Sequence, residues 1–315
     1  MPSLTRTIAI SWVAIIASLQ VAGAGELGPT LQKIKDKGTI TLGYREDTIP
    51  MSYADAQQPE GFALDLCALA VSKAKQKLGL AELKTDYKAV TQADAAALLK
   101  DGTLSMDCAA TPVEGQLAQQ ATFSSPIFVS ELRWIVPRRL RIEREGRHGM
   151  RYETISPAST EDLKGKPVVF TQGAGVTLFV LTLSSDRSLG LSILEGKDNA
   201  DSFKLFETGK ASAFLADDVL LVSLKANAKN PDAYGFLSDA YPSASYALML
   251  GKDDKEFKDL VDGALLEAMK SGEYAKLYAK WFVSPIPPKN INLAYPMPDT
   301  LKELVKAAAE KAGGQ

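Results

Sequence analysis

Hydrophobic side chains near the start of the chain follow two different periods. In residues 39–44 (TITLGY), large apolar side chains alternate with smaller ones, which is the two-residue period of a strand. The pattern resumes at Phe62 with helical spacing and ends at Gly79, a residue suited to the left-handed conformation that closes helices. A strand, a polar loop and a helix are therefore predicted, with Arg45 where the strand ends. Ligands of open α/β sheets bind at such strand ends, so Arg45 is a candidate ligand-binding residue, the alternative being a solvated loop arginine.

Strand and helix patterns continue to alternate along the chain, which predicts largely parallel sheets with right-handed crossovers. Two apolar strand patterns, at 127–136 and 246–250, fit strands that pass between two domains. The other expected strands are 83–90, 104–109, 167–170, 192–194 and 211–216. The predicted class is α/β, and 315 residues suffice for two domains of about 100–200 residues each.

The charge of the whole chain argues against a polyanionic partner. Lys and Arg (36) nearly balance Asp and Glu (38), so no overall positive field attracts nucleic acid or an anionic membrane surface. Two cysteines and one histidine leave few groups for a zinc site or a cysteine–histidine nucleophile. We expect no nucleic acid, no metal and no cofactor.

The first 24 residues have the organisation of a secretory signal peptide. Arg6 supplies a positive start, residues 8–21 are mostly apolar, and residues 22–24 (AGA) form a small-residue cleavage pattern. A membrane anchor is the competing interpretation, but the apolar run is short for the roughly 20 residues that a span needs. We therefore expect a signal peptide at 1–24 and an exported, periplasmic protein.

The two cysteines, Cys67 and Cys108, have two alternative states. An oxidising compartment permits a disulfide between them. Cys67 lies in a helical pattern and Cys108 ends a strand pattern, so both could equally be free thiols in the core. The sequence leaves both alternatives open.

A polar, highly charged segment at 137–160 interrupts the α/β pattern and contains the only histidine, His148. We expect this segment to be an exposed excursion. A lone histidine in a charged loop has no visible partner to orient it, so a catalytic role for His148 is not expected.

Two further strand ends carry candidate ligand-binding groups. The turn 171–175 (TQGAG) follows the strand at 167–170 and can present backbone N–H groups to an anion, although such turns also occur without ligands. Asp217 and Asp218 follow the strand at 211–216. The alternative role for these aspartates is to cap the next helix, which would account for only one of them well.

Several short motifs recur in a recognisable order over about 250 residues. They are GYRED, PMSY, GFALDL, DGT, ATFSSPIFV, DLKGKPVVFTQG, DSFKLFETGKASAFLADD, LGKDDKEFK, SGEYAKLYAKWF and PIPPKNINL. In this order they resemble the extracytoplasmic solute-binding proteins of polar amino-acid ABC transporters, within them the glutamate/aspartate-binding group. The tail PIPPKNINL is the most group-specific of these motifs.

The resemblance implies a type II periplasmic binding protein fold: two α/β lobes, each a mainly parallel sheet flanked by helices, joined by two crossing strands. Lobe one would comprise residues 25–131 and 242–315, and lobe two residues 132–241. The ligand would lie in the cleft between the lobes, which close around it.

The resemblance also implies roles for individual residues. Arg45 matches the arginine that holds an anionic ligand side chain, and Asp217 matches the aspartate that holds the ligand ammonium group. Thr171, with the backbone of Gly173, matches the turn that contacts the α-carboxylate. A zwitterion needs a cation, an anion and fixed dipoles, so this set is chemically sensible. Two further family positions are occupied by Thr111 and Asn199.

The chain departs from the family pattern where positive charge is expected. The arginine that clamps the α-carboxylate is Leu117 here, and a second arginine is Ala95. Donors beside the strand end are replaced by Ala110 and Pro112, and a histidine in the second lobe is replaced by Asn199. A buried carboxylate without these partners would cost several kcal/mol. We therefore expect a ligand with a single anionic group, or one whose apolar part packs on Leu117, Ala95 and Ala110.

The leading hypothesis is a monomeric periplasmic substrate-binding protein that delivers an amino acid or related solute to an ABC permease in the inner membrane. One alternative is a periplasmic enzyme on the same fold, similar to cyclohexadienyl dehydratase, in which Glu114 or Asp217 acts as general acid or base if burial raises its pKa. The other alternative is a solute-sensing protein that presents its closed form to a receptor. Of the three, we expect the binding protein, which is not an enzyme.

Overall fold

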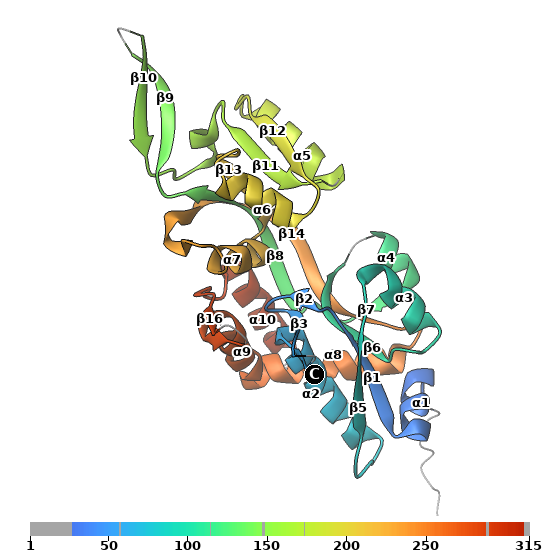
Figure 1. Cartoon of the computed structure of the whole chain (residues 1–315). Helices are drawn as coiled ribbons and strands as arrows, with labels where there is room; N and C mark the ends of the chain where they lie inside the picture. Colours follow the sequence, from blue (N-terminus) through green and yellow to red (C-terminus); the bar gives the residue numbers. More distant parts are fainter. Residues whose placement is uncertain are drawn as a thin grey trace, which may run out of the picture.

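The computed structural model describes residues 27–56, 58–113, 115–146, 149–172, 174–287 and 290–311. Figure 1 shows two α/β bodies bridged by the long strands β8 (Phe128–Pro137) and β14 (Tyr234–Leu250). The predicted fold class, two lobes joined by two crossing strands, is confirmed. The predicted signal peptide, His148, Glu114 and Gly173 lie outside the described residues. None of the described helices is both long and apolar enough to cross a membrane.

Lobe one is built on the parallel strands β1 (Thr39–Tyr44), β5 (Lys84–Ala89) and β6 (Met106–Pro112). Its helices are α1 (Pro29–Lys37), α2 (Phe62–Lys77), α3 (Gln92–Lys100), α4 (Gly115–Gln120), α8 (Lys255–Ser271), α9 (Glu273–Tyr278), η3 (Ala279–Val283) and α10 (Asp299–Lys311). Its short strands are β2 (Asp47–Thr48), β3 (Ser52–Asp55), β4 (Gln58–Glu60), β7 (Thr122–Phe123), β15 (Pro285–Ile286) and β16 (Ile291–Asn292).

Lobe two is built on the parallel strands β11 (Pro167–Thr171), β12 (Ser192–Gly196) and β13 (Ala213–Asp217). Its helices are η1 (Thr160–Leu163), α5 (Ala174–Asp186), α6 (Asn199–Glu207), α7 (Asp218–Ala226) and η2 (Pro231–Ala233). The predicted excursion at 137–160 is a hairpin, β9 (Leu140–Gly146) and β10 (Gly149–Ile155). Regular strands form there because Leu140 and Ile142 alternate with charged residues, a two-residue period that the charge density hides.

One hydrogen-bonded path joins the strands of both lobes in the order β12-β11-β13-β8-β14-β6-β1-β5. The crossing strands are antiparallel to each other and to their neighbours β13 and β6. In their register, Tyr241 pairs with Leu132 and Pro242 with Glu131. The expected lobe boundaries thus fall at the same level of both strands, although the lobe sheets are continuous rather than separate.

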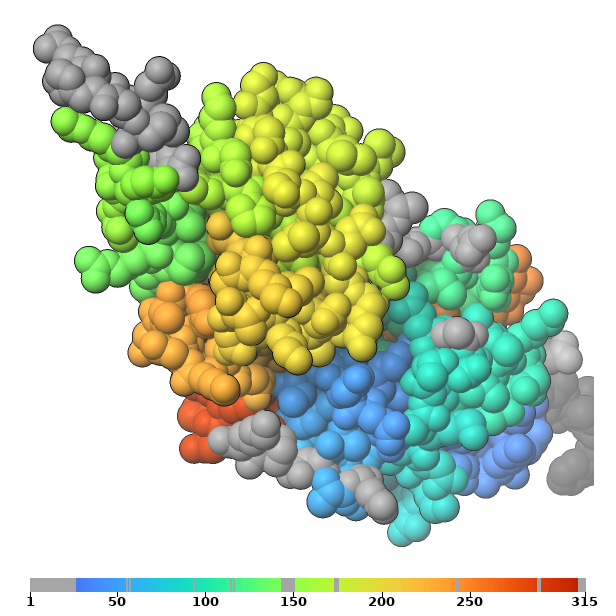
Figure 2. All heavy atoms as spheres, turned by 45° about the horizontal axis from the view of Figure 1, so that its top comes forward, coloured from blue at the N-terminus to red at the C-terminus, as the bar shows by residue number. Residues whose placement is uncertain are grey.

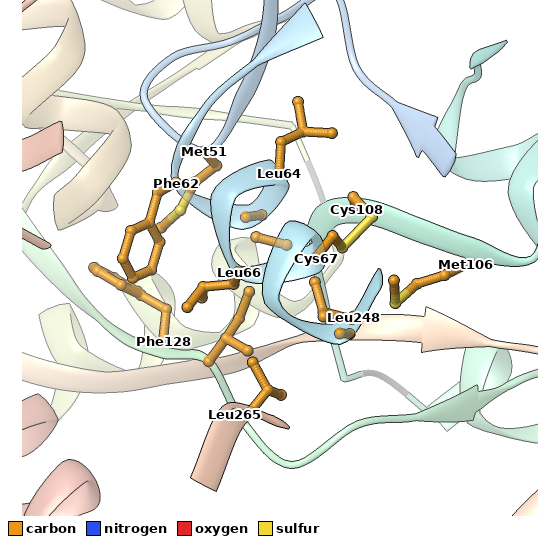
Figure 3. Close-up of a cluster of buried hydrophobic side chains, with 14 of the residues drawn as sticks. Met51, Phe62, Leu64, Leu66, Cys67, Met106, Cys108, Phe128, Leu248 and Leu265 are labelled. Carbon is orange, nitrogen blue, oxygen red and sulfur yellow. A yellow bond between two sulfur atoms is a disulfide. The ribbon is translucent and has the colours of Figure 1, made fainter. Parts of the chain in front are cut away.

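Helix α2 begins at Phe62, the residue predicted from the sequence, and packs into the core of lobe one. Gly61 precedes it with φ 143°, and a Cβ there would lie 2.4 Å from the carbonyl oxygen of Met51, so only glycine allows this approach. Phe62 is fully buried in the cluster shown in Figure 3. Its ring meets those of Tyr274 and Phe282 edge to face at 5.4 and 5.3 Å. This packing fixes the start of α2 against α9 and η3.

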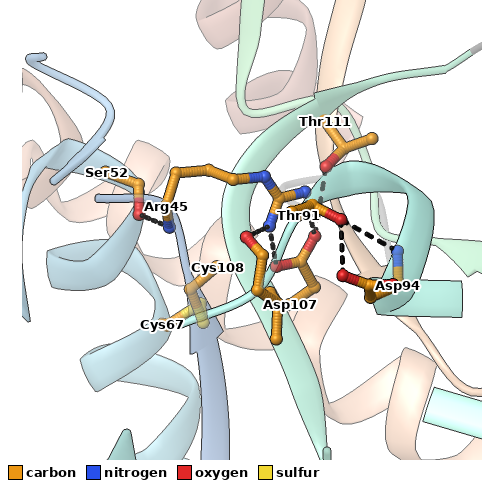
Figure 4. Close-up of polar contacts among 9 residues, drawn as sticks. Arg45, Ser52, Cys67, Thr91, Asp94, Asp107, Cys108 and Thr111 are labelled. Atoms are coloured by element: carbon orange, nitrogen blue, oxygen red, sulfur yellow. Dashed lines mark hydrogen bonds and ion pairs between the residues drawn. A yellow bond between two sulfur atoms is a disulfide. The ribbon is translucent and has the colours of Figure 1, made fainter. Parts of the chain in front are cut away.

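The cysteines form a disulfide between α2 and β6, which resolves the alternative that the sequence leaves open. Cys67 and Cys108 have a Cα–Cα distance of 6.2 Å and are 41 residues apart in sequence. Both are fully buried (Figure 3), and Cys108 directly follows Asp107 in β6 (Figure 4). The bridge ties the central helix of lobe one to the strand that carries Asp107 and Thr111.

Candidate functional site

Arg45 lies where β1 ends, as predicted, but its guanidinium is engaged inside the protein. Nη1 and Nη2 donate to the two carboxylate oxygens of Asp107 at 3.0 and 3.1 Å, and Nη1 also donates to the carbonyl of Val90 at 3.3 Å (Figure 4). The side chains are 13% and 0% exposed. Such a bidentate pair is the strong form of the arginine–carboxylate interaction, so Asp107 neutralises the cation that was predicted to hold a ligand anion.

Thr111 belongs to the same group. Its hydroxyl donates to Asp107 Oδ2 at 3.2 Å, and the residue is buried in β6. Burial raises the pKa of Asp107, while Arg45 and the hydrogen bond from Thr111 oppose the rise. Thr111 therefore supports the ion pair in this structure.

A cavity of about 460 Å³ lies beside Arg45. It is lined by lobe-one residues alone: Arg45, Glu46, Asp47, Ala89, Val90, Thr91, Gln92 and Asp94. Three of these carry exposed carboxylates and one carries a guanidinium that is already paired, so the lining favours positive over negative ligand groups. A larger hollow of about 830 Å³, between α1, α3 and residues 251–254, contains none of the predicted ligand residues.

The positions where family arginines are replaced differ in their surroundings. Ala95 is fully buried in α3, packed with Leu99 and Met249, and Ala110 is 6% exposed. Neither offers a ligand much surface in this conformation, so the expected apolar contacts with them are not available here. Leu117, in α4, is partly exposed.

In lobe two, the candidate residues Thr171 and Asn199 lie in contact. Thr171 ends β11, and its hydroxyl donates to Asn199 Oδ1 at 2.7 Å and lies 2.9 Å from Ser202 Oγ. Gly196 permits this approach, because a Cβ there would lie 2.2 Å from Ser202 Oγ. The group sits at the N-terminus of α6, where the side chain of Asp198 accepts a hydrogen bond from the backbone N–H of Asp201 and the remaining N–H groups favour anions.

Asp217 ends β13, where lobe two meets the crossing strands. Tyr246 of β14 donates a hydrogen bond from its hydroxyl to Asp217 Oδ2. The side chain of Asp217 makes no capping hydrogen bond to α7, so the helix-cap explanation does not apply to it. Asp217 is partly exposed and thus accessible to a ligand.

Asp218 is fully buried and serves a different purpose. It accepts hydrogen bonds from Ser130 Oγ at 2.6 Å, from the backbone N–H of Val219 at 2.7 Å and from the hydroxyl of Tyr295. Burial raises its pKa, and these hydrogen bonds oppose the rise. Asp218 thus joins lobe two, the crossing strand β8 and the C-terminal segment of the chain.

The structure therefore divides the predicted residues into three groups. Arg45 and Thr111 both donate hydrogen bonds to Asp107, Thr171 is hydrogen-bonded to Asn199, and Asp217 is hydrogen-bonded to Tyr246. Each group lies on or next to a strand of the central sheet. Sequence reasoning missed Asp107 and Tyr246. A signal for Asp107 was present, because it is a charged residue within an apolar strand pattern and such a residue needs a buried partner. Within the described ranges, no three His, Cys, Asp or Glu residues are grouped as metal ligands.

Two α/β lobes on two shared strands, with polar groups at the strand ends of both, define a two-lobe binding protein. The chain belongs to the bacterial extracellular solute-binding proteins, family 3, whose profile matches residues 40–284.

Its relatives are binding proteins. The chain is 36% identical over 318 aligned residues to the L-glutamate/L-aspartate-binding protein of Pseudomonas aeruginosa, covering 100% of this chain and 98% of the relative. It is 36% identical over 291 residues to the glutamate/aspartate import solute-binding protein of Salmonella typhimurium, covering 92% and 91%. Among solved structures, it is similar to an ancestral cationic amino acid solute-binding protein, with a TM-score of 0.58, 24% identity, and 80% and 99% coverage. The prediction of a binding protein rather than an enzyme is confirmed by these relatives.

Proposed function

We propose that the protein captures an amino acid between its lobes in the periplasm, after cleavage of residues 1–24, and delivers it as a monomer to an ABC permease in the inner membrane. The family and the import function in the names of two relatives support this proposal. Lobe two, residues 132–241, moves as one body on β8 and β14 when the cleft closes.

The observation that carries the ligand class is the ion pair between Arg45 and Asp107. A dicarboxylic amino acid brings two negative charges and one positive charge. Arg45 is already neutralised, and Glu46, Asp47 and Asp94 surround the adjoining cavity. A second ligand carboxylate would meet repulsion rather than a cation. The ligand is therefore an amino acid with a neutral or basic side chain.

The lobe-two residues hold the common part of such a ligand. Asp217 accepts from the ammonium group, since it is the partly exposed carboxylate that ends β13. Thr171, Asn199 and the backbone of Gly173 hold the α-carboxylate, helped by the positive end of the α6 dipole. The site thus offers one carboxylate, Asp217, and one set of hydrogen-bond donors, while the charge of Arg45 is already neutralised. This combination matches a ligand with no net negative charge.

Calorimetric titration with glutamate, aspartate and a panel of neutral and basic amino acids tests the ligand class. A neutral or basic amino acid should bind at least tenfold more tightly than either acidic one. Submicromolar affinity for glutamate or aspartate would contradict the ligand class while leaving the solute-binding function in place.

Small-angle scattering tests capture by closure. The radius of gyration should fall when the amino acid that binds in calorimetry is added, because lobe two rotates toward lobe one. An unchanged radius with a saturating ligand would contradict the two-lobe clamp.

A further inference from the structure

The hairpin β9–β10 projects from lobe two as an arm, which we define as residues 138–146 and 149–155. Figure 1 shows its ribbon extending beyond the body of the lobe, and Figure 2 shows its described atoms, in green, at the edge of lobe two. Its strands pair with each other in a two-stranded sheet of their own, from Leu140 with Ile155 to Gly146 with Gly149. The arm is anchored at its base by Leu140 and Ile142, which are 6% and 8% exposed and belong to the core of lobe two. The solute site described above uses none of its residues.

The arm concentrates the arginines of the chain. Of ten arginines in the sequence, five lie in the arm, whereas none of the 26 lysines does. With three glutamates, the arm has a formal charge of +2, while the whole chain has −2. The near-balance of the whole chain thus hides a local basic region. Arginine differs from lysine in its planar fork, which binds carboxylates and phosphates with two hydrogen bonds.

The described side chains place this charge on both faces of the arm. Arg138, Arg139, Arg141 and Arg151 are exposed. In the strand register, Arg141 lies on the same face as Tyr152, and its guanidinium carbon is 4.1 Å from the centroid of that ring. Arg151 lies on the opposite face. Tyr152 is 58% exposed and, among the described arm residues, is the one large apolar side chain that is exposed.

We infer that the arm binds the anionic headgroups of phospholipids at a membrane surface. A specific protein partner would cover one face and would need an apolar, largely uncharged centre, which the described side chains of the arm do not provide. Exposed arginines on a ribbon that projects beyond the lobe instead suit a layer of phosphates, which needs no matching apolar surface. Each basic residue near an anionic surface strengthens binding about fivefold, and a tyrosine at the interface adds to it. The inference rests on the proposed export only for its biological setting, in which the arm would hold the protein near the membrane that carries the permease.

Co-sedimentation with lipid vesicles tests the inference on the full chain. The protein should bind vesicles of phosphatidylcholine and phosphatidylglycerol (3:1) but not vesicles of phosphatidylcholine alone, and binding should weaken with added salt. The triple variant R139Q/R141Q/R151Q should bind the anionic vesicles about 100-fold more weakly, from about fivefold for each arginine.

A matched variant, K35Q/K100Q/K210Q, removes the same charge from exposed positions outside the arm and should bind vesicles like the unaltered protein. Thermal unfolding and amino-acid titration of both variants confirm that fold and solute site are intact, which separates this test from that of the proposed function. No binding to anionic vesicles, or equal losses in the two variants, would overturn the inference. Binding to polyglutamate but not to these vesicles would also overturn it, in favour of an acidic protein partner.

Discussion

Arg45 and Asp107 face each other with two guanidinium nitrogens against two carboxylate oxygens, at 3.0 and 3.1 Å. They come from different strands, the first from the end of β1 and the second from within β6. The disulfide next to Asp107 holds β6 against α2, so this pair is fixed in place before any ligand arrives. Arg45 therefore forms an ion pair inside the protein before it can interact with a ligand.

Replacing Asp107 by asparagine should release this cation. The change removes a charged acceptor from two arginine nitrogens, so the free energy of unfolding in urea should fall by about 1.5–3 kcal/mol. Glutamate and aspartate should then bind more tightly in calorimetry, because Arg45 can pair with a ligand carboxylate. Glu46→Gln is the matched control, since it removes an exposed carboxylate from the same cavity and should change stability by less than about 0.5 kcal/mol. Equal stability of the two variants would show that Asp107 does not carry the charge assigned to it.

Asp217→Asn should weaken binding of the preferred amino acid by about 2–5 kcal/mol, as expected when one member of a desolvated charge pair is lost. Its melting temperature should stay close to that of the unaltered protein, because the Asp217 side chain does not cap α7. Tyr246→Phe keeps the carboxylate and removes one hydrogen bond to it, so it should cost about 0.5–1.5 kcal/mol of binding. Calorimetry on the three proteins measures the difference. If Asp217→Asn binds as well as the unaltered protein, the carboxylate does not contact the ligand ammonium.

The disulfide should contribute substantially to stability. It closes a loop of 41 residues, for which the chain-entropy relation gives about 4 kcal/mol. The double variant C67S/C108S should therefore unfold at a lower urea concentration, and a reductant should lower the midpoint of the unaltered protein but not of the variant. A midpoint insensitive to both changes would mean that the bridge does not constrain the unfolded chain.

Asp218 should give stability a recognisable pH dependence. Burial raises its pKa above the ordinary value of 3.8, which the unfolded chain retains. Between these two pKa values the folded state binds more protons than the unfolded state, so the contribution of Asp218 to stability falls as pH rises. The unfolding free energy of the unaltered protein minus that of Asp218→Asn should decrease as pH rises above 3.8. The raised pKa of Asp107 is present in both proteins and cancels. A constant difference across this range would mean that the hydrogen bonds to Asp218 fully offset its burial.

The alternation of periods in the sequence predicted most of the strands and helices of the fold. The strand at 39–44 and the helix that begins at Phe62 were predicted correctly, because both have strong local signals. The strand has alternating apolar residues, and the helix has helical spacing that ends at Gly79, whose φ of 63° favours glycine. The end of β6 was less certain, and the strand runs to Pro112 rather than to residue 109. It extends because β14 pairs with its last residues, a contact between positions more than 130 residues apart.

The positions of the candidate ligand residues could be predicted, but their partners could not. A strand end is a local feature, and Arg45, Thr171 and Asp217 all lie at one. The partner of Arg45 lies 62 residues away, and that of Asp217 lies 29 residues away, so no local pattern reports either contact. These partners determine whether a charge is available to a ligand. Residue type alone therefore predicted that Arg45 binds a ligand anion, whereas in the structure Asp107 already neutralises it.

The contact between Tyr295 and Asp218 has a consequence for comparing relatives. Tyr295 lies beyond residues 40–284, the part of the chain that matches the family profile, yet it supports a buried carboxylate beside the crossing strand. A segment outside the family profile therefore helps to hold the crossing strand β8, so a comparison of relatives restricted to residues 40–284 leaves out part of the support of that strand.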